Sequence, residues 1–187
     1  MPHLAGQSNA PLPAGTPAPP IDAPVTPDQK VSLEDFRGAP LVLVFYPADW
    51  SPVCSDELAL FNELLPEFER LGAQVMAISC DGVWCHLAFA RARNLHMVLA
   101  SDFHPQGAIS RAYNVFQEDA GTSERALFVL DAEGKVFWSH RSPVAVNPGA
   151  DGVLDALERL AGRSGSMSED AGVSTRRGAP GHPGVHS

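Results

Sequence analysis

Residues 41–57 read LVLVFYPADWSPVCSDE, and within this stretch the residue pattern changes from strand to helix. The first six residues form a continuous apolar run that ends at Pro47, which is typical of a strand buried on both faces. Ser51 is a favourable N-cap residue, and Pro52 is preferred at the first position of a helix. The stretch therefore predicts a buried strand, a short loop and a helix, with Cys54 in the first helical turn.

Apolar runs and helical patterns alternate along the rest of the chain. Apolar side chains at helical spacing predict helices over residues 52–71 with a kink at Pro66, 84–94, 107–115 and 151–160. Apolar runs predict further strands, the last two forming a hairpin, over residues 73–79, 97–102, 125–131 and 136–141. Residues 31–38 fit either a short strand and turn or a single helical turn. Parallel strands need helical crossovers and a hairpin is antiparallel, so this order predicts an α/β sandwich with a mixed central β-sheet.

The length of 187 residues predicts a single domain, and the apolar share of 44% is typical of a globular core. Residues 1–12 are small, polar and rich in proline, so we expect them to be disordered. Residues 163–187 hold no large apolar side chain beyond one methionine and two valines, and we expect the same of them. The folded domain is accordingly predicted to span residues 13–162.

Charge and composition exclude several classes of function. A formal net charge of −9 argues against binding to nucleic acid or to an anionic membrane surface. No segment approaches the ~18 consecutive apolar residues of a membrane span, and no basic flank precedes an apolar core at the N-terminus. Three cysteines without an export signal predict reduced thiols and a cytoplasmic location.

The predicted position of Cys54 favours a reactive thiol. Backbone N–H groups in the first turn of a helix lack helical partners and point toward the sulfur, and the helix dipole adds partial positive charge. Both effects favour the thiolate, which is the nucleophilic form. The predicted strand also delivers Cys54 to its C-terminal end, where open α/β sheets place their binding sites.

The motif around Cys54 resembles the active-site motif of a known family. Pro47, Ser51 and Cys54 fit the spacing Pro-x-x-x-Thr/Ser-x-x-Cys, which resembles the peroxidatic motif of the peroxiredoxins. The resemblance covers roughly residues 11–160, because further blocks match as well: SCDGVWCHLAFA, SDFHPQGAISRAYNV and RALFVLDAEGKV. Within the family, the segment ADWSPVCSDEL is most similar to the alkyl hydroperoxidase E and bacterioferritin-comigratory branches.

The resemblance implies a thioredoxin-like fold and reduction of small-molecule peroxides, without a metal, flavin or haem cofactor. It implies that Cys54 attacks the peroxide and becomes a sulfenic acid, that the Ser51 hydroxyl binds the peroxide, and that Pro47 shields the thiolate. Arg125 matches the family arginine that holds the thiolate and the peroxide oxygens, and Glu57 matches an acid that orients this arginine. Such chemistry needs an anionic sulfur, and it needs hydrogen-bond donors that stabilise the negative charge that develops on the departing oxygen.

Each of these residues also has a purely structural interpretation. Ser51 fits a simple helix cap, Pro47 the end of a strand, and Arg125 an exposed ion pair. Glu57 fits an acidic residue in a first helical turn, where the dipole favours negative charge. Cys54 taken alone fits an inert buried thiol, and its combination with Pro47, Ser51, the helix start and Arg125 favours the catalytic interpretation.

The sequence leaves the reductant of the sulfenic acid open. No cysteine follows Cys85, and Ala59 stands five residues after Cys54, so the internal candidates are Cys80 and Cys85. Cys80 ends an apolar strand and is interpreted as a packing residue, while Cys85 begins a helix and is a possible resolving cysteine. We favour an external thiol, which the resemblance identifies as a thioredoxin-like or mycoredoxin-like protein or a low-molecular-weight thiol.

Other functions were weighed against a peroxidase. A peroxide sensor or holdase that uses the same cysteine is the main alternative, and slow reduction by general thiol donors would distinguish it. A disulfide reductase is disfavoured because Cys54 lacks a CxxC partner. A Cys–His hydrolase would need a histidine that orients Cys54, whereas the helix dipole and Arg125 already account for an activated thiol. Zinc binding through Cys80, Cys85 and His86 is disfavoured because no second ligand pair exists.

The sequence also suggests how the remaining aromatic and histidine residues are used. The family resemblance implies a homodimer packed around the active-site loops, and Trp50, Trp84 and Phe116 are the candidates for its interface. The histidines show no metal-ligand spacing, so His86, like the others, is interpreted as a surface or helix-cap residue.

Overall fold

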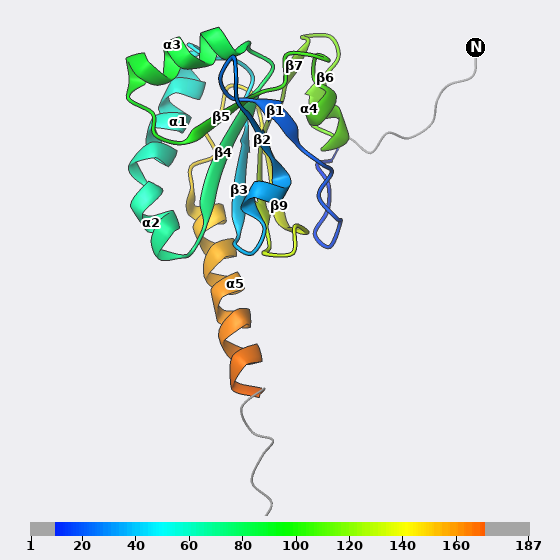
Figure 1. Ribbon diagram of the computed structural model, residues 1–187, viewed down its shortest axis with the longest axis vertical. Coiled ribbons are helices and arrows are strands. Elements are labelled where there is room, and N and C mark those ends of the chain that lie inside the picture. The colour runs from blue at the N-terminus through cyan, green and yellow to red at the C-terminus, as the bar shows by residue number, and fades with distance from the viewer. Residues whose placement is uncertain (1–9, 171–187) are drawn as a thin grey trace, which may run out of the picture.

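The structure is a computed structural model that describes residues 10–170. A five-stranded sheet with strand order β5-β4-β3-β8-β9 forms its centre (Figure 1). β3 is parallel to β4 and β4 to β5, while β8 is antiparallel to both β3 and β9. The strand bounds are β3 (Leu41–Phe45), β4 (Gln74–Ser79), β5 (Val98–Ser101), β8 (Arg125–Leu130) and β9 (Val136–Ser142). This is the mixed central sheet that the sequence predicts.

Helices cover both faces of the sheet. They are η1 (Leu33–Phe36), α1 (Pro52–Glu63), α2 (Leu65–Arg70), α3 (Val83–Arg93), α4 (Ala108–Ala112) and α5 (Asp151–Asp170). Two small hairpins complete the fold, with strands β1 (Asp22–Pro24), β2 (Lys30–Ser32), β6 (Phe116–Gln117) and β7 (Thr122–Ser123). The sequence predicts neither hairpin, because strands of two or three residues are too short to show an apolar alternation.

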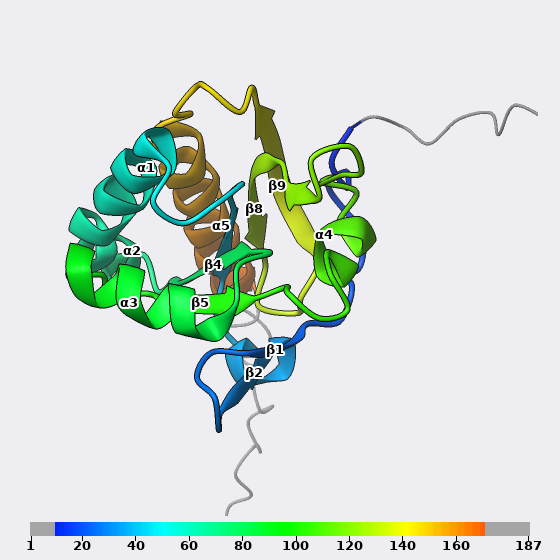
Figure 2. The same cartoon turned by 90° about the horizontal axis from the view of Figure 1, so that it is seen from above.

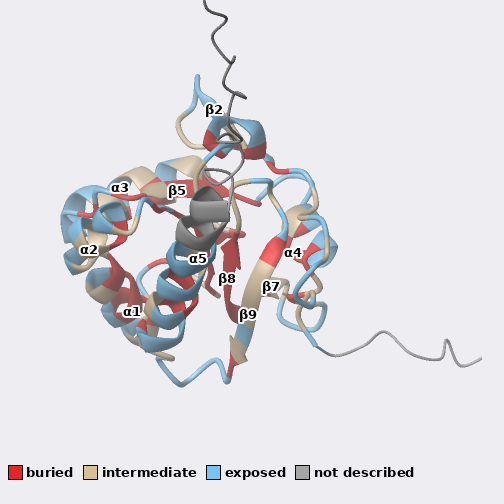
Figure 3. Ribbon diagram, turned by 90° about the horizontal axis from the view of Figure 1, so that it is seen from below, coloured by how far each residue is buried: buried red, intermediate tan, exposed pale blue. Residues whose placement is uncertain are grey.

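The two faces of the sheet bury two separate hydrophobic clusters. Alternate side chains of β3 point to opposite faces, so Val42 and Val44 join one cluster while Leu43 and Phe45 join the other. The first cluster is covered by α1, α2, α3 and α5, and the second by the β1–β2 hairpin, η1 and the region of α4 (Figure 2). β3 and β8 are buried along their whole length between these layers, the edge strand β9 is mostly half-buried, and the outer surfaces of the helices are exposed (Figure 3).

The predicted kink at Pro66 is a complete break between two helices. α1 ends at Glu63, Leu64 links it to α2, and Pro66 lies in the first turn of α2. Proline lacks an N–H group and its ring clashes with the carbonyl four residues earlier, which favours a kink or a break, and here the helix breaks. Gly72 follows α2 with a φ of 73°, a left-handed conformation that suits glycine at a helix end.

The last helix is longer than the predicted 151–160. α5 continues to Asp170 and runs past the edge of the sheet (Figure 1), although its apolar stripe ends near Leu160. The helix prediction was too short because it followed the apolar stripe. The domain limits 13–162 stay a prediction, and residues 1–9 and 171–187 of the predicted disordered ends lie outside the described residues. Among residues 10–170, no helix has the length and apolar character required to cross a bilayer.

Candidate active site

Cys54 lies at the start of α1, where the chain has just left the C-terminal end of β3. Ser51 is the N-cap residue, and its carbonyl accepts the first helical hydrogen bond from the N–H of Ser55 at 2.8 Å. The N–H groups of Val53 and Cys54 precede this bond, so they are available to a ligand at the helix start. The hydroxyl of Ser51 makes no capping hydrogen bond, so Ser51 occupies the N-cap position without capping the helix through its side chain.

Arg125 brings a positive charge to the sulfur from a distant part of the sequence. It opens β8, which pairs with β3 so that Ala126 lies opposite Phe45, at the end of β3 that leads to Cys54. The Arg125 Nη2 atom lies 3.2 Å from the Cys54 Sγ atom, and Nη1 donates to Glu57 Oε2. Cys54 is fully buried and the exposed fraction of Arg125 is only 1%. The interpretation of Arg125 as an exposed ion pair is therefore wrong.

A main-chain carbonyl completes the orientation of the guanidinium. The carbonyl oxygen of Val144 accepts hydrogen bonds from Arg125 Nε at 3.0 Å and from Nη2 at 2.8 Å. Val144 follows β9, and its side chain is apolar and exposed. Because the contact uses the main-chain carbonyl, the residue type at position 144 does not indicate it. Together Cys54, Glu57 and the Val144 carbonyl hold the guanidinium plane in one orientation.

Glu57 faces Arg125 from the next turn of α1 and is fully buried. Burial raises the pKa of Glu57 to about 7, and the charge of Arg125 opposes part of this rise. Its Oε1 atom has no hydrogen-bond partner among the described residues. Glu57 therefore gains or loses its proton near neutral pH, which changes the negative charge beside the guanidinium.

The loop between β3 and α1 carries Pro47, which is half-buried, and a buried network that sequence reasoning missed. Asp49 Oδ1 accepts a hydrogen bond from the Tyr46 hydroxyl at 2.7 Å, and Asp49 Oδ2 lies 2.8 Å from His86 Nδ1. The exposed fraction of His86 is only 1%, so its interpretation as a surface or cap residue is wrong. Only the fold brings Asp49 and His86 together, although Asp49 stands inside the motif.

Cys54 and the other two cysteines, Cys80 and Cys85, are all free thiols. Cys80 is buried, and desolvation, followed by the charge of Asp102, raises its pKa to about 11. Cys85 is half-buried, and desolvation together with Asp49 raises its pKa to about 11. Both thiols therefore hold their protons at neutral pH.

Asp49, Asp81 and Cys85 offer ligand atoms within 4.8 Å of one another, but they do not make a convincing metal site. Both carboxylate oxygens of Asp49 already contact Tyr46 and His86. Asp81 Oδ2 accepts hydrogen bonds from the Asp49 N–H at 2.9 Å and from the Ser79 hydroxyl at 2.6 Å. These carboxylates are engaged within the protein.

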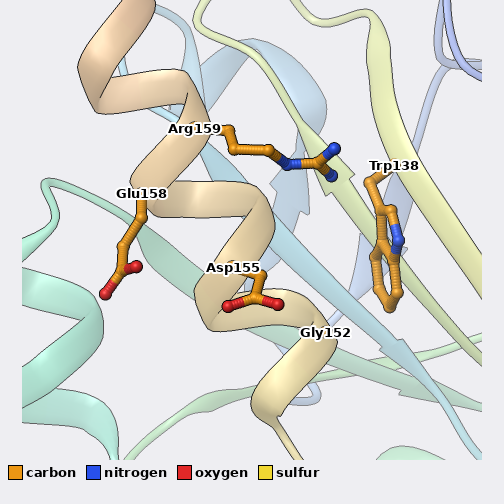
Figure 4. Close-up of a pocket in the computed structure, with 5 residues that line it drawn as sticks. All are labelled: Trp138, Gly152, Asp155, Glu158 and Arg159. Atoms are coloured by element: carbon orange, nitrogen blue, oxygen red, sulfur yellow. The ribbon is translucent and has the colours of Figure 1, made fainter.

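A separate pocket of about 520 Å³ lies between α5 and β9 and contains none of the residues described above (Figure 4). Its lining residues are Trp138, Gly152, Asp155, Glu158 and Arg159. Gly152 makes room for the indole, because a Cβ atom there would lie 2.7 Å from Trp138 Cζ2. The charged residues of this pocket are exposed, so it lacks the buried polar group typical of a catalytic site.

The fold and the site together define a class of protein. A buried cysteine at a helix start, beside a buried arginine on a mixed sheet, defines a thiol-based redox protein with a thioredoxin-like fold. The sequence model of the AhpC/TSA family matches residues 14–139. The chain belongs to this family, the peroxiredoxins.

Individual relatives agree with this assignment. A Synechocystis sp. protein that carries a peroxiredoxin name is 35% identical over 159 residues, covering 80% of this chain and 78% of that protein. Alkyl hydroperoxide reductase E of Mycobacterium tuberculosis is 40% identical over 107 residues, covering 57% and 70%. Thioredoxin peroxidase of Echinococcus granulosus is 37% identical over 111 residues, covering 56% of each chain. The crystal structure of the reduced Plasmodium vivax 2-Cys peroxiredoxin superposes with a TM-score of 0.76 at 27% identity, covering 84% and 86%.

Proposed function

We propose that the protein is a thiol-dependent peroxidase in which Cys54 reduces hydrogen peroxide and organic hydroperoxides. The observation that carries this proposal is the 3.2 Å contact between Arg125 Nη2 and Cys54 Sγ at the start of α1. A fixed guanidinium and a helix N-terminus both stabilise negative charge on the sulfur and on the oxygen that leaves. Membership of the AhpC/TSA family supports the same activity, as do relatives named for the reduction of peroxides.

The chemistry is a single displacement at oxygen. The thiolate of Cys54 attacks one oxygen of the peroxide, an S–O bond forms and the O–O bond breaks. The bonding electron pair leaves with the second oxygen, which takes a proton and departs as water or an alcohol. Cys54 is left as a sulfenic acid. In this proposal Arg125 and the N–H groups of Val53 and Cys54 stabilise the charge on both oxygens.

The neighbouring residues prepare this step. The Ser51 hydroxyl, which makes no capping bond, binds the peroxide, and half-buried Pro47 keeps water from the sulfur. Glu57 holds one side of the Arg125 guanidinium, while the Val144 carbonyl holds the other. The guanidinium is thereby oriented before the peroxide arrives, which is the condition for efficient stabilisation of a transition state.

We further propose that an outside thiol reduces the sulfenic acid. The attacking species in such a reaction is a thiolate, and the raised pKa values of Cys80 and Cys85 disfavour both as internal partners. A thioredoxin-like or mycoredoxin-like protein, or a low-molecular-weight thiol, supplies the two electrons and becomes a disulfide. The name thioredoxin peroxidase, carried by one relative, supports a reductant of the thioredoxin type. A reducing compartment such as the cytoplasm fits this cycle.

The proposal includes a homodimer packed around the active-site loops. Trp50 and Trp84 have exposed fractions of 49% and 72%, which is unusual for such large apolar side chains. Phe116 supports an interface less well, because it is half-buried and the Arg111 guanidinium covers its ring at 3.8 Å from the centroid.

Intact mass after one equivalent of hydrogen peroxide tests the function and its intermediate. The proposal expects consumption of the peroxide and the gain of one oxygen by the reduced protein, located on the peptide that contains Cys54. Loss of two hydrogens would instead identify an internal disulfide and contradict the external reductant. A protein that consumes no peroxide would contradict the function itself.

A further inference from the structure

The loop that carries the proposed peroxide-binding residue contains a strained position. Trp50 has a φ of 66°, in the left-handed region that bulky residues rarely adopt. Such a conformation persists only where the surroundings hold it. The Trp50 ring packs edge-on against Phe89, with a centroid distance of 5.2 Å, but about half of the residue is exposed. The neighbours of Trp50 must therefore supply the remaining restraint.

Asp49, directly before Trp50, is held from three separate elements. Its side chain accepts the Tyr46 hydroxyl from the end of β3 and contacts His86 Nδ1 from α3. Its backbone N–H donates to Asp81 Oδ2 at 2.9 Å, beyond the end of β4. Asp81 is itself fixed, because its carbonyl accepts a hydrogen bond from the Ser101 hydroxyl at 2.5 Å. Both the side chain and the main chain of Asp49 are thus tied to the sheet and to α3.

His86 is the partner that ties the loop to α3. Its side chain and that of Asp49 have exposed fractions of only 1% and 0%. His86 Nδ1 lies 2.8 Å from the carboxylate oxygen Asp49 Oδ2, and an imidazole nitrogen that carries a hydrogen can donate to such an oxygen. A buried carboxylate is costly without such donors. Loss of the imidazole would therefore release the Asp49 side chain and relax the strained loop.

We propose that Asp49, held by His86, is a positioning residue that sets the place of the Ser51 hydroxyl relative to Cys54. Asp49 lies two residues before Ser51, and only the strained Trp50 separates them. A displacement of about 1 Å in a substrate-binding group is enough to lower a rate substantially. The inference rests on the proposed peroxidase function, because the Ser51 hydroxyl acts only on the peroxide.

Two rates measured on the same protein test this role. The first is the second-order rate of Cys54 oxidation by hydrogen peroxide, which uses Ser51, and the second is its alkylation by iodoacetamide, which does not. In His86→Leu we expect the peroxide rate to fall roughly tenfold while the alkylation rate stays within about twofold. His86→Asn keeps an N–H group near the position of Nδ1 and is expected to restore most of the peroxide rate. Leu87→Ala, in the same helix, is the control for lost packing alone and is expected to leave both rates unchanged.

A double-mutant cycle identifies the residue through which Asp49 acts. Once Ser51→Ala has removed the hydroxyl, the further loss caused by His86→Leu is expected to shrink to less than about twofold. If His86→Leu does not fold, Asp49→Asn takes its place, because it replaces one of the two acceptor oxygens with an amide group.

The outcomes separate this inference from the proposed function. Equal losses in the two rates, full additivity with Ser51→Ala, or an unchanged peroxide rate would each overturn the positioning role. Each of these results presupposes a wild-type protein that reacts with peroxide. A wild-type protein that does not react would overturn the proposed function first.

Discussion

Two helix starts in this protein present a cysteine at the same position but surround it differently. Cys54 is the third residue of α1, and Cys85 is the third residue of α3. Both sulfurs therefore receive the same contribution from the helix dipole. The Arg125 guanidinium lies against Cys54, whereas Cys85 faces Asp49 and Asp81, and burial with these carboxylates raises its pKa to about 11. The start of a helix alone therefore does not lower the pKa of a thiol, as Cys85 shows, and we propose that the opposite sign of the charge beside Cys54 makes the difference.

The hydrogen-bond networks around Arg125 and around Asp49 also differ in what they hold in place. Arg125 is held by Glu57 and the Val144 carbonyl and offers positive charge to a buried sulfur. Asp49 is held by His86 and Tyr46, and it stabilises the shape of a loop rather than a charge on a thiol. In the proposed mechanism the first network acts directly on the Cys54 sulfur, and the second acts on the backbone of the loop beside it.

Removal of the Cys54 thiol is expected to have the largest effect on peroxide reduction. Cys54→Ser is expected to abolish the consumption of hydrogen peroxide, because a serine hydroxyl is not ionised at neutral pH and does not displace a peroxide oxygen. Loss of peroxide in a coupled dye assay measures the rate. Cys80→Ser is the matched control, since Cys80 is also buried but is not part of the Cys54–Arg125 contact, and it is expected to retain the activity.

Removal of the guanidinium tests whether neighbouring charge distinguishes the two helix starts. Arg125→Ala is expected to lower the second-order rate with peroxide roughly a hundredfold or more, as expected for loss of a donor to developing negative charge. Stopped-flow measurement under single-turnover conditions isolates this step. Arg141→Ala is the control, because Arg141 lies on β9 and pairs with Glu124 at 2.6 Å. A loss of less than about tenfold would remove Arg125 from the mechanism.

The residues close to Cys54 in the chain could be placed from the sequence. Of the site residues that are distant in the chain, only Arg125 could be identified. The apolar run before Pro47, the cap at Ser51 and Pro52 all lie within a few residues of Cys54, so they predict the strand, the loop and the helix start. Arg125 stands 71 residues away, and only the resemblance to a family pointed to it. Nothing in residue type marks the Val144 carbonyl as a ligand of the guanidinium.

Asp49 and His86 were missed for a related physical reason. Polar residues are mostly exposed, so a histidine without metal-ligand spacing is most simply interpreted as a surface residue. Burial of this pair depends on the loop after β3 lying against α3, which joins residues 37 positions apart in the chain. The same holds for the β1–β2 and β6–β7 hairpins, whose strands gain stability from tertiary packing rather than from their own pattern.

The buried carboxyl beside Arg125 predicts a distinctive dependence of stability on pH. Burial raises the pKa of Glu57 from an ordinary 4.5 to about 7, so the folded protein binds a proton that the unfolded chain releases. Its contribution to stability is therefore fully present below pH 4.5 and is lost as the pH rises through about 7. Relative to Glu57→Gln, the wild-type protein is expected to lose free energy of unfolding on the order of 3 kcal/mol across this range.

Urea denaturation of the reduced proteins at several pH values between 5 and 8 measures this difference. The Glu57→Gln variant keeps the shape of the side chain without its titration, so subtraction cancels the other titrating groups. A difference that rises with pH would contradict the raised pKa of Glu57. It would show instead that the Arg125 charge outweighs the cost of burial.

The smallest expected effect on the rate of peroxide reduction is that of replacing Cys85 at the start of α3. Cys85→Ser is expected to change the rate of peroxide reduction by less than about twofold and to leave the gain of one oxygen as the product, because a thiol that keeps its proton attacks a sulfenic acid slowly. In the Cys54→Ser protein, alkylation of Cys85 is expected to accelerate steadily as the pH is raised toward 11. Mass mapping of the alkylated peptides follows this residue separately from Cys80. Rapid labelling of Cys85 at pH 7 would show that the helix dipole outweighs Asp49 and Asp81, and that the two helix starts differ less than their neighbouring charges imply.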